Sequence, residues 1–284
     1  MADIRVLVTG SGGFVGQAVC STLRSRLIDV VALKHSDLDI CDAIAVTAAM
    51  QRVHPMWVVH CAALASTAYC REHPDESMAV NVEGTLNVAR AAHTIGARLV
   101  YCSSDQVYSG CTAEGPLSED LQLQPNHPYG AHKLLMEQLV QAETPSAIAL
   151  RLTWMYDAQN DGRRHGVCST LAQAAAQGTT LKACTREHRG MTHVGDVAAG
   201  ICSIIERNIP GGVYNFGSPN SFTTFDTLVA ATANRRAEAP EAVPNIEPDD
   251  SWSRNLAMDI ARISSLGITF PPTAERLAEF VGRL

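Results

Sequence analysis

The sequence predicts an α/β fold, a doubly wound parallel sheet with a smaller C-terminal lobe. Three observations predict this fold. Short apolar, β-branched runs alternate with segments of helical character over the first 156 residues, and such alternation builds βαβ units around a parallel sheet. The first apolar run ends in glycines, which mark a tight turn from strand to helix. After residue 156 the alternation weakens, and polar and loop residues become more frequent.

Six runs are expected to form buried strands, because their apolar character is continuous rather than alternating. They span residues 4–9, 29–33, 56–62, 98–103, 147–153 and 211–217. Helices are expected between them. Asp42 suits a helix start, Pro55 a stop and Gly96 a C-cap. The helical segments are 14–26, 42–54, 74–95, 127–142 and 192–207.

Composition narrows the class of protein. The 284 residues carry a net charge of -7, which argues against a nucleic-acid-binding surface. No apolar run approaches the ~18–20 residues needed to span a membrane, and the chain starts directly with a strand pattern. The nine cysteines are odd in number and show no C-x-x-C spacing, so we expect reduced thiols, no metal site and a cytoplasmic protein.

A glycine-rich turn follows the first expected strand. Val15 stands where the last glycine of a strict G-x-G-x-x-G would fall, but Gly10, Gly13 and Gly16 fit G-x-x-G-x-x-G. Glycines permit close backbone approach, and free N–H groups at a helix start hold a pyrophosphate. We therefore predict a Rossmann-type cofactor site at this turn, including Phe14 and Val15 of the first helical turn.

The same pattern sets the expected domains. Residues 1–156 are predicted to form the dinucleotide-binding domain, to which 192–218 return. The segments 157–191 and 219–284 are predicted to form the substrate-binding lobe.

The end of the second strand bears on the choice of cofactor. An acidic residue there usually holds the ribose 2′-OH of NAD, whereas a basic one suits the 2′-phosphate of NADP. Here Leu33 is followed by Lys34 and His35, with no acid before Asp37. NADP(H) is therefore favoured, with NAD(H) as the alternative.

Three residues form a candidate catalytic set. Tyr129 and Lys133 are four residues apart near an expected helix start, so they share a helical face. A lysine cation should lower the pKa of the phenol, which could then protonate a forming alkoxide. Ser104 ends the fourth strand, at the edge where ligands bind in such sheets, and its hydroxyl could hydrogen-bond the same oxygen.

On these residues the chain resembles the extended short-chain dehydrogenases/reductases. Within that family it is most similar to the dTDP-4-dehydrorhamnose reductases. The resemblance runs nearly end to end. It rests on Val8-Thr9-Gly10, Asp37-Leu38-Asp39-Ile40-Cys41-Asp42, His60-Cys61-Ala62-Ala63, Asn81-Val82, Ser103-Ser104-Asp105-Gln106-Val107-Tyr108, Tyr129 to Lys133, and Arg151-Leu152-Thr153-Trp154-Met155-Tyr156.

The resemblance implies roles for further residues. Asp39 and Ile40 would contact the adenine side of the cofactor, and Ala62 and Ala63 would line its path. Lys133 would also hold the nicotinamide ribose.

On the substrate side, the resemblance implies that Trp154 lies against the sugar, where an aromatic face suits a hexose. Arg189, which begins R-x-x-x-H-V-x-D, would bind the nucleotide pyrophosphate. Asp105, like Ser104, is predicted to bind the substrate. His193 and Asp196 are expected to be structural.

Two differences from relatives refine the expected reaction. Related 4,6-dehydratases carry a glutamate base where this chain has Gln106, and an amide cannot remove a proton. Many relatives have an Asp-Lys pair where this chain has Ala68 and Tyr69. A dehydratase reaction is thus disfavoured, and the sequence does not determine which sugar is bound.

We therefore expect an NAD(P)H-dependent oxidoreductase that reduces a 4-keto nucleotide sugar, as in dTDP-rhamnose biosynthesis. Two alternatives remain at this point. One is a nucleotide-sugar 4-epimerase, which would retain its NAD. The other is a non-catalytic regulatory subunit, because the resemblance extends to the β subunit of methionine adenosyltransferase. A homodimer is a further expectation.

Overall fold

The computed structural model describes residues 4–158 and 164–282. Its contacts divide the chain into two compact units. Unit 1 comprises residues 1–110, 122–151 and 197–214, and unit 2 comprises 111–121, 152–196 and 215–284.

A six-stranded sheet forms the centre of unit 1. Its strand order is β11-β5-β4-β3-β1-β2, and β1 pairs in parallel with both β2 and β3. From β1 the chain first forms β2 on one side and then β3 and the later strands on the other side. The carboxyl ends of β1 and β3 therefore flank a topological switch point, where such sheets bind ligands. The strands are β1 (Arg5–Thr9), β2 (Asp29–Leu33), β3 (Trp57–His60), β4 (Arg98–Ser104), β5 (Ile148–Leu152) and β11 (Gly212–Phe216).

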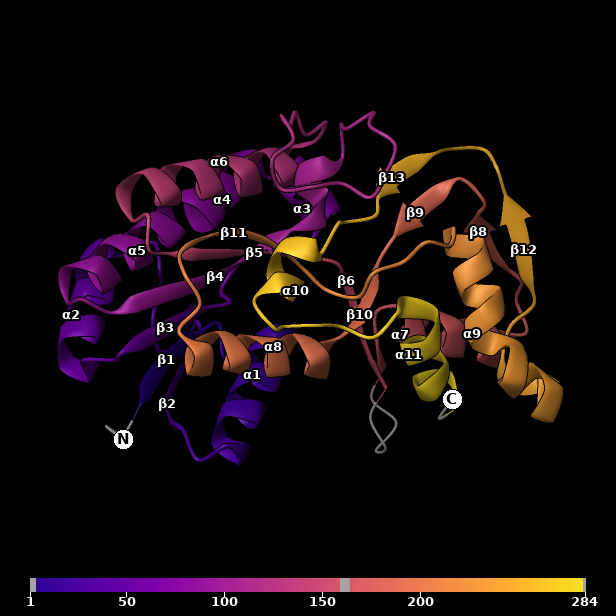
Figure 1. Cartoon of the computed structure of the whole chain (residues 1–284), viewed down its shortest axis with the longest axis horizontal. Coiled ribbons are helices and arrows are strands. Elements are labelled where there is room, and N and C mark those ends of the chain that lie inside the picture. The colour runs from indigo at the N-terminus through magenta and orange to yellow at the C-terminus, as the bar shows by residue number, and fades with distance from the viewer. Residues whose placement is uncertain (1–3, 159–163, 283–284) are drawn as a thin grey trace. The chain divides into compact units, whose positions relative to one another are not determined.

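Helices cover both faces of this sheet. Figure 1 shows α5 and α6 along one face and α1 and α8 along the other. In the core, strand residues such as Leu7 and Leu99 pack with Met50, Val88 and Met136 of the covering helices. The helices are α1 (Phe14–Ser25), α2 (Ala43–Val53), α3 (Thr67–Glu72), α4 (Pro74–Met78), α5 (Thr85–Thr94), α6 (Pro128–Glu143) and α8 (Val194–Arg207), with a 3-10 turn η2 (Asp105–Tyr108) after β4. The predicted doubly wound fold is confirmed.

The segment predicted as one helix over 74–95 is more complex. A π-helical stretch, η1 (Ala79–Gly84), joins α4 to α5. Within it, Asn81 accepts the Leu64 N–H (2.9 Å) and donates to the Leu64 carbonyl (3.0 Å). These bonds fix the loop after β3. The short helix α3 in that loop was not expected from the sequence.

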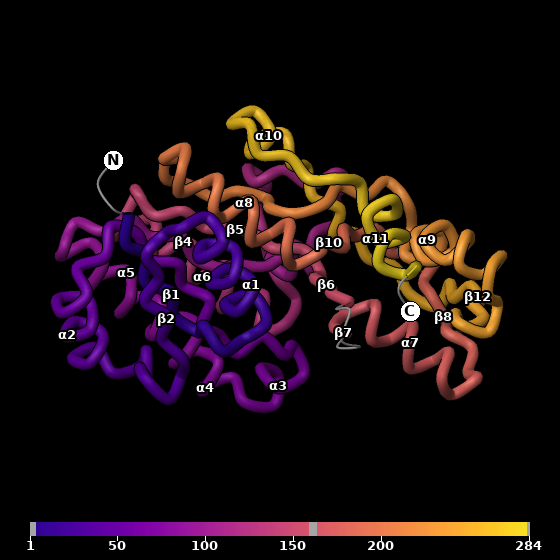
Figure 2. The backbone as a smooth tube through the Cα atoms, turned by 90° about the horizontal axis from the view of Figure 1, so that it is seen from below, coloured from indigo at the N-terminus to yellow at the C-terminus, as the bar shows by residue number. Residues whose placement is uncertain are grey.

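Unit 2 is built from short strands and packed helices. Strand β6 pairs in parallel with β10 and antiparallel with β7, while β8 pairs with β12 and β9 with β13. Figures 1 and 2 both show α9 and α11 side by side. The elements are β6 (Trp154–Ala158), β7 (Arg164–His165), α7 (Val167–Gln177), β8 (Leu181–Cys184), β9 (Glu187–Arg189), β10 (Met191–His193), α9 (Thr224–Glu238), η3 (Pro240–Ala242), β12 (Ile246–Asp249), β13 (Arg254–Leu256), α10 (Ala261–Ser265) and α11 (Thr273–Val281).

The boundary between the units differs from the sequence-based prediction. It falls after Arg151 rather than after residue 156. Residues 111–121, expected to be a loop of the first domain, belong to unit 2, where Leu117 bridges to Met258 and its carbonyl accepts from Asn215 (2.8 Å). Over residues 4–158 and 164–282, no helix has the length and apolar character needed to cross a membrane.

Candidate functional site

The structure brings together the three residues of the candidate catalytic set in unit 1. Ser104 ends β4, and Tyr129 and Lys133 lie one turn apart near the start of α6. All three are buried, with 8%, 7% and 3% of their surface exposed. The Ser104 hydroxyl influences the Tyr129 phenol and opposes the rise of its pKa, and the Lys133 ammonium lies 5.9 Å from the centre of the Tyr129 ring. The predicted constellation therefore exists as a contact cluster.

The electrostatics of Tyr129 differ from expectation. Burial raises the pKa of the Tyr129 phenol well above its usual value, and the hydrogen bond with Ser104 only partly opposes this rise. Burial likewise lowers the pKa of Lys133, whose ammonium donates to the Cys102 carbonyl (2.8 Å). The expectation of a lowered Tyr129 pKa is wrong for this structure, because desolvation of the buried phenol is the largest influence on its pKa. Tyr129 keeps its proton through neutral pH and is thus a proton donor.

A chain of hydrogen bonds orients the neighbouring polar residues. The Gly130 N–H donates to Nδ1 of His127 (3.1 Å), so Nδ1 is unprotonated and Nε2–H donates to Gln106 Oε1 (3.2 Å). Gln106 Nε2 in turn donates to Asp105 Oδ1 (3.0 Å), which also accepts from Ser104 Oγ (3.2 Å). Gln106 therefore uses its amide as a linker, and it has no basic site for proton removal.

A cavity of about 500 Å³ opens where β2, β1 and β3 end. Seven of the predicted cofactor-binding residues line it: Gly10, Gly13, Lys34, Asp39, Ile40, Ala62 and Ala63. The other five, Phe14, Val15, Gly16, Tyr129 and Lys133, are not among its lining residues. Gly16 instead packs helix α1 onto the turn, because a Cβ there would collide with the Gly10 carbonyl oxygen.

The turn after β1 has the features of a phosphate cradle. Gly10 has φ +65°, and a Cβ on it would lie 2.5 Å from the Ala62 nitrogen. The hydroxyl of Ser11 is buried and has no hydrogen-bond partner within the described chain. An unsatisfied buried hydroxyl beside a helix N-terminus fits a bound phosphate. The residues present therefore fit a dinucleotide.

The residues that follow β2 favour a cofactor with a 2′-phosphate. Asp37, the first acid after β2, accepts the Lys34 backbone N–H through its carboxylate (2.9 Å) and so caps the turn. Lys34 lines the cavity with an exposed side chain. Asp39 also lines it, and its carboxylate accepts the Cys41 N–H (2.9 Å).

The cavity also includes residues that sequence reasoning missed. They are Gly12, His35, Ser36, Leu38, Cys61, Leu64, Glu76 and Val80. Glu76 and Val80 come from α4 and η1, whose placement over the end of β3 depends on the Asn81–Leu64 bonds. Glu76 accepts from the Tyr69 hydroxyl (2.7 Å), so the segment that differs from relatives contacts the cavity lining.

In unit 2, Trp154 and Arg189 lie together. The guanidinium of Arg189 sits 5.2 Å from the centre of the Trp154 ring, and the Arg189 carbonyl accepts from Asn220 (2.8 Å). His193 bonds Asp157 (3.0 Å) and accepts the Gly195 N–H (3.2 Å), as expected of a structural residue. Asp196 pairs with Arg276 (2.8 Å), which is also a structural contact.

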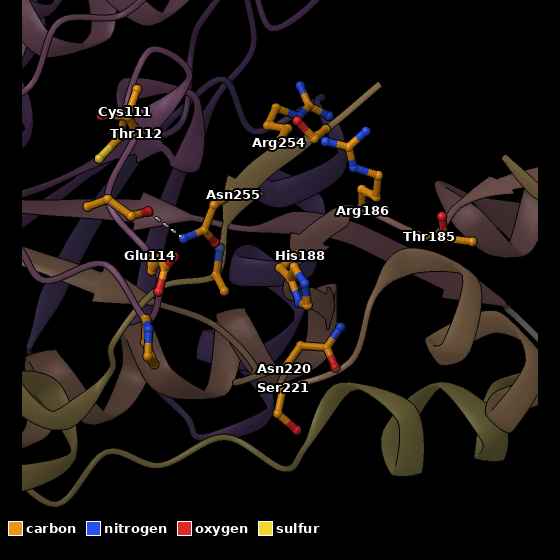
Figure 3. A pocket seen from close by; sticks show the side chains of 15 residues that line it. Cys111, Thr112, Glu114, Thr185, Arg186, His188, Asn220, Ser221, Arg254 and Asn255 are labelled. Carbon is orange, nitrogen blue, oxygen red and sulfur yellow. Dashed lines mark hydrogen bonds between the residues drawn. The ribbon is translucent and has the colours of Figure 1, made fainter. Parts of the chain in front are cut away.

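Unit 2 contains a second and larger cavity, of about 940 Å³. Figure 3 shows Arg186, His188 and Arg254 on one side of it and Glu114 on another. Arg254 pairs with Glu187 through Nε and Oε1 (2.9 Å). Arg189, predicted to bind pyrophosphate, is not among the lining residues. Sequence reasoning missed Arg186 and His188, because neither belongs to a recognisable motif.

The chain is 30% identical over 233 residues to a dTDP-4-dehydrorhamnose reductase of Streptomyces griseus, covering 80% of this chain and 75% of that one. It is 28% identical to methionine adenosyltransferase 2 subunit beta of Xenopus laevis, covering 93% of this chain and 83% of that one.

Solved structures show the same fold. A dTDP-4-dehydrorhamnose reductase from Bacillus anthracis, in complex with NADP, superimposes with a TM-score of 0.84 at 22% identity, and 98% of each chain is covered. The family model described as RmlD substrate binding domain matches residues 4–283. The chain therefore belongs to the RmlD substrate binding domain family, within the extended short-chain dehydrogenases/reductases.

Proposed function

We propose that this protein is an oxidoreductase that uses NADPH to reduce a 4-keto nucleotide sugar. The observation that carries the proposal is the buried contact cluster of Ser104, protonated Tyr129 and Lys133. It lies at the strand edge that also forms the cofactor cavity. Relatives named dTDP-4-dehydrorhamnose reductase support the substrate class.

Each residue has a defined part in this reaction. The bound nicotinamide would supply the hydride for the carbonyl carbon. The Tyr129 hydroxyl donates its proton to the carbonyl oxygen, and Ser104 orients that oxygen by a hydrogen bond. Lys133, fixed by the Cys102 carbonyl, supplies positive charge that stabilises the phenolate left behind. Lys34 would hold the 2′-phosphate, which makes NADPH the preferred cofactor and NADH the poorer one.

The cavity of unit 2 supports the nucleotide part of the proposal. Arg186 has an exposed side chain at its rim, and Arg254 and His188 add donors on the same side. Guanidinium groups suit the oxygens of a diphosphate. Trp154 and Arg189 form the neighbouring aromatic and cationic pair of the same unit.

A panel of 4-keto nucleotide sugars, followed by NADPH and NADH absorbance, tests this function. We expect net oxidation of NADPH with at least one member of the panel. Cofactor that stays bound and is never consumed would instead identify the 4-epimerase. No turnover with any member would refute the reductase.

A second candidate is a regulatory subunit, which the coverage of 93% of this chain by methionine adenosyltransferase 2 subunit beta supports. Recovery of a stoichiometric synthetase in a pull-down, together with no turnover on any keto sugar, would favour it. We also propose a cytoplasmic location, since all nine cysteines are free thiols, and a homodimer, which gel filtration would test.

A further inference from the structure

Two cysteines face each other at the carboxyl edge of the sheet. Strands β3 and β4 are parallel, with His60 opposite Tyr101. A cysteine follows each of these two residues, just after the end of β3 and within β4, and the sulfurs of Cys61 and Cys102 lie 3.9 Å apart. Both residues are half-buried, and Cys61 lines the cofactor cavity. Neither thiol has a part in the reaction described above.

We propose that Cys61 and Cys102 are an oxidisable pair, and that their disulfide switches off cofactor binding. A disulfide needs a sulfur–sulfur distance of about 2.05 Å, so the two thiols must approach by almost half their present separation. The two positions are neighbours on paired strands about 4.8 Å apart, near the short end of the Cα separations that disulfides span, so the bridge forms by side-chain rotation with a local adjustment of the backbone. Strained bridges of this kind are readily reduced again, as a reversible switch requires.

The two thiols have different roles in the chemistry. The hydrogen bond between them, helped by the Lys133 ammonium, holds the pKa of Cys102 below its usual value. The same contact, together with burial, holds the pKa of Cys61 well above its own. The Cys102 thiolate is therefore the nucleophile.

Hydrogen peroxide serves as the oxidant. The Cys102 thiolate attacks one peroxide oxygen, the O–O bond breaks, and hydroxide leaves, which gives a sulfenic acid. The Cys61 sulfur then attacks the Cys102 sulfur, and its proton departs with the displaced hydroxide as water. The two thiols lose two electrons, and the peroxide is reduced to two molecules of water.

The position of the pair explains why the bridge would disturb cofactor binding. The Cys61 N–H donates to the Thr9 carbonyl (3.2 Å), and the backbone of Cys61 and Ala62 is the surface on which Gly10 packs. On the other strand, the Cys102 carbonyl holds the Lys133 ammonium (2.8 Å). Drawing the sulfurs together therefore shifts both the phosphate turn and the lysine.

The test treats the reduced full-length protein with hydrogen peroxide. Non-reducing peptide mapping by mass spectrometry identifies the cross-link, and NADPH fluorescence measures affinity before and after. We expect a Cys61–Cys102 cross-link, a rise of about tenfold or more in the Kd for NADPH, and recovery in dithiothreitol. In a redox buffer of reduced and oxidised dithiothreitol, bound NADPH should lower the equilibrium extent of cross-linking by the same factor, because the coupling of the two equilibria is reciprocal.

Variants separate the two roles, and each is compared with its own reduced state. Cys61→Ser should stop at a Cys102 sulfenic acid that dimedone traps, whereas Cys102→Ser should give no adduct at Cys61. Cys41→Ser, which removes an exposed thiol outside the pair, should respond like the parent protein. The proposal is overturned if no such cross-link forms, if the cross-linked protein keeps its affinity, or if the reversible loss persists in Cys102→Ser. These readouts need no keto sugar, so they stand apart from the test of the proposed function.

Discussion

Replacing Gly10 with alanine adds one methyl group at the point where the turn after β1 meets the end of β3. The φ of +65° lies in the left-handed region, which costs a residue with a Cβ roughly 1–2 kcal/mol. The new Cβ would lie 2.5 Å from the Ala62 nitrogen, 2.6 Å from its Cα and 2.7 Å from the Cys61 carbonyl carbon. These are backbone atoms that cannot rotate away, so overpacking adds roughly 1–3 kcal/mol.

We therefore expect Gly10→Ala to lower the free energy of unfolding by roughly 2–5 kcal/mol. Urea denaturation followed by circular dichroism measures this value. Gly12→Ala in the same turn is the matched control. Its Cβ would meet only the Lys34 side chain, at 3.4 Å, so the change should stay within about 0.5 kcal/mol. Equal effects of the two substitutions would refute the packing of this turn on β3.

Three further predictions test the cofactor choice and the buried polar groups. Lys34→Glu should raise the KM for NADPH more than that for NADH, and equal effects in steady-state kinetics would contradict a 2′-phosphate role. Burial lowers the pKa of His60 to about 3, so the unfolded chain binds a proton at a higher pH than the folded chain does. The free energy of unfolding should therefore fall by on the order of 4 kcal/mol as the pH drops from about 6.5 towards 3. His60→Gln should flatten this dependence in urea titrations, and an unchanged slope would exclude His60. Glu137→Gln leaves Arg151 buried without its carboxylate partner (2.7 Å) and should lower the free energy of unfolding by about 3–5 kcal/mol. Glu143→Gln, on the surface of the same helix, should lower it by less than about 1 kcal/mol. Similar urea midpoints for the two variants would argue against the buried pair.

The sheet of unit 1 was predictable because its central strands β3, β4 and β5 are largely buried, and the half-buried edge strand β2 still has a continuous apolar run. Continuous apolar runs located β1, β2 and β4 to within a residue or two. The predicted 74–95 helix contains a π-helical stretch, in which Asn81 makes a tertiary contact with Leu64. Local sequence patterns contain no information about that contact.

The limits of prediction are clearest in unit 2. Its strands are two to five residues long, too short to show a period, and they pair with partners far along the chain. Strand β9 pairs with β13, so that Glu187 lies opposite Arg254. That pairing places Arg254 on the large cavity, together with Arg186 and His188. No motif in the sequence indicates this arrangement.

The candidate catalytic residues were predictable because spacing alone fixes a shared helical face. Tyr129 and Lys133 needed only the helix period, and Ser104 only the end of a strand. The pKa of Tyr129 was not predictable, because it depends on how completely the phenol is buried. The linker role of Gln106 required the position of His127, which caps α6.

The central claim is that Tyr129 protonates a carbonyl oxygen while its carbon receives hydride from the reduced cofactor. The most direct test uses NADPH deuterated at the transferred position, together with a 4-keto nucleotide sugar, and follows the product by NMR. We expect one deuterium at C4, and a rate that Tyr129→Phe lowers by about 100-fold or more without loss of NADPH binding. A product without deuterium, or a Tyr129→Phe variant with full rate, would contradict the account.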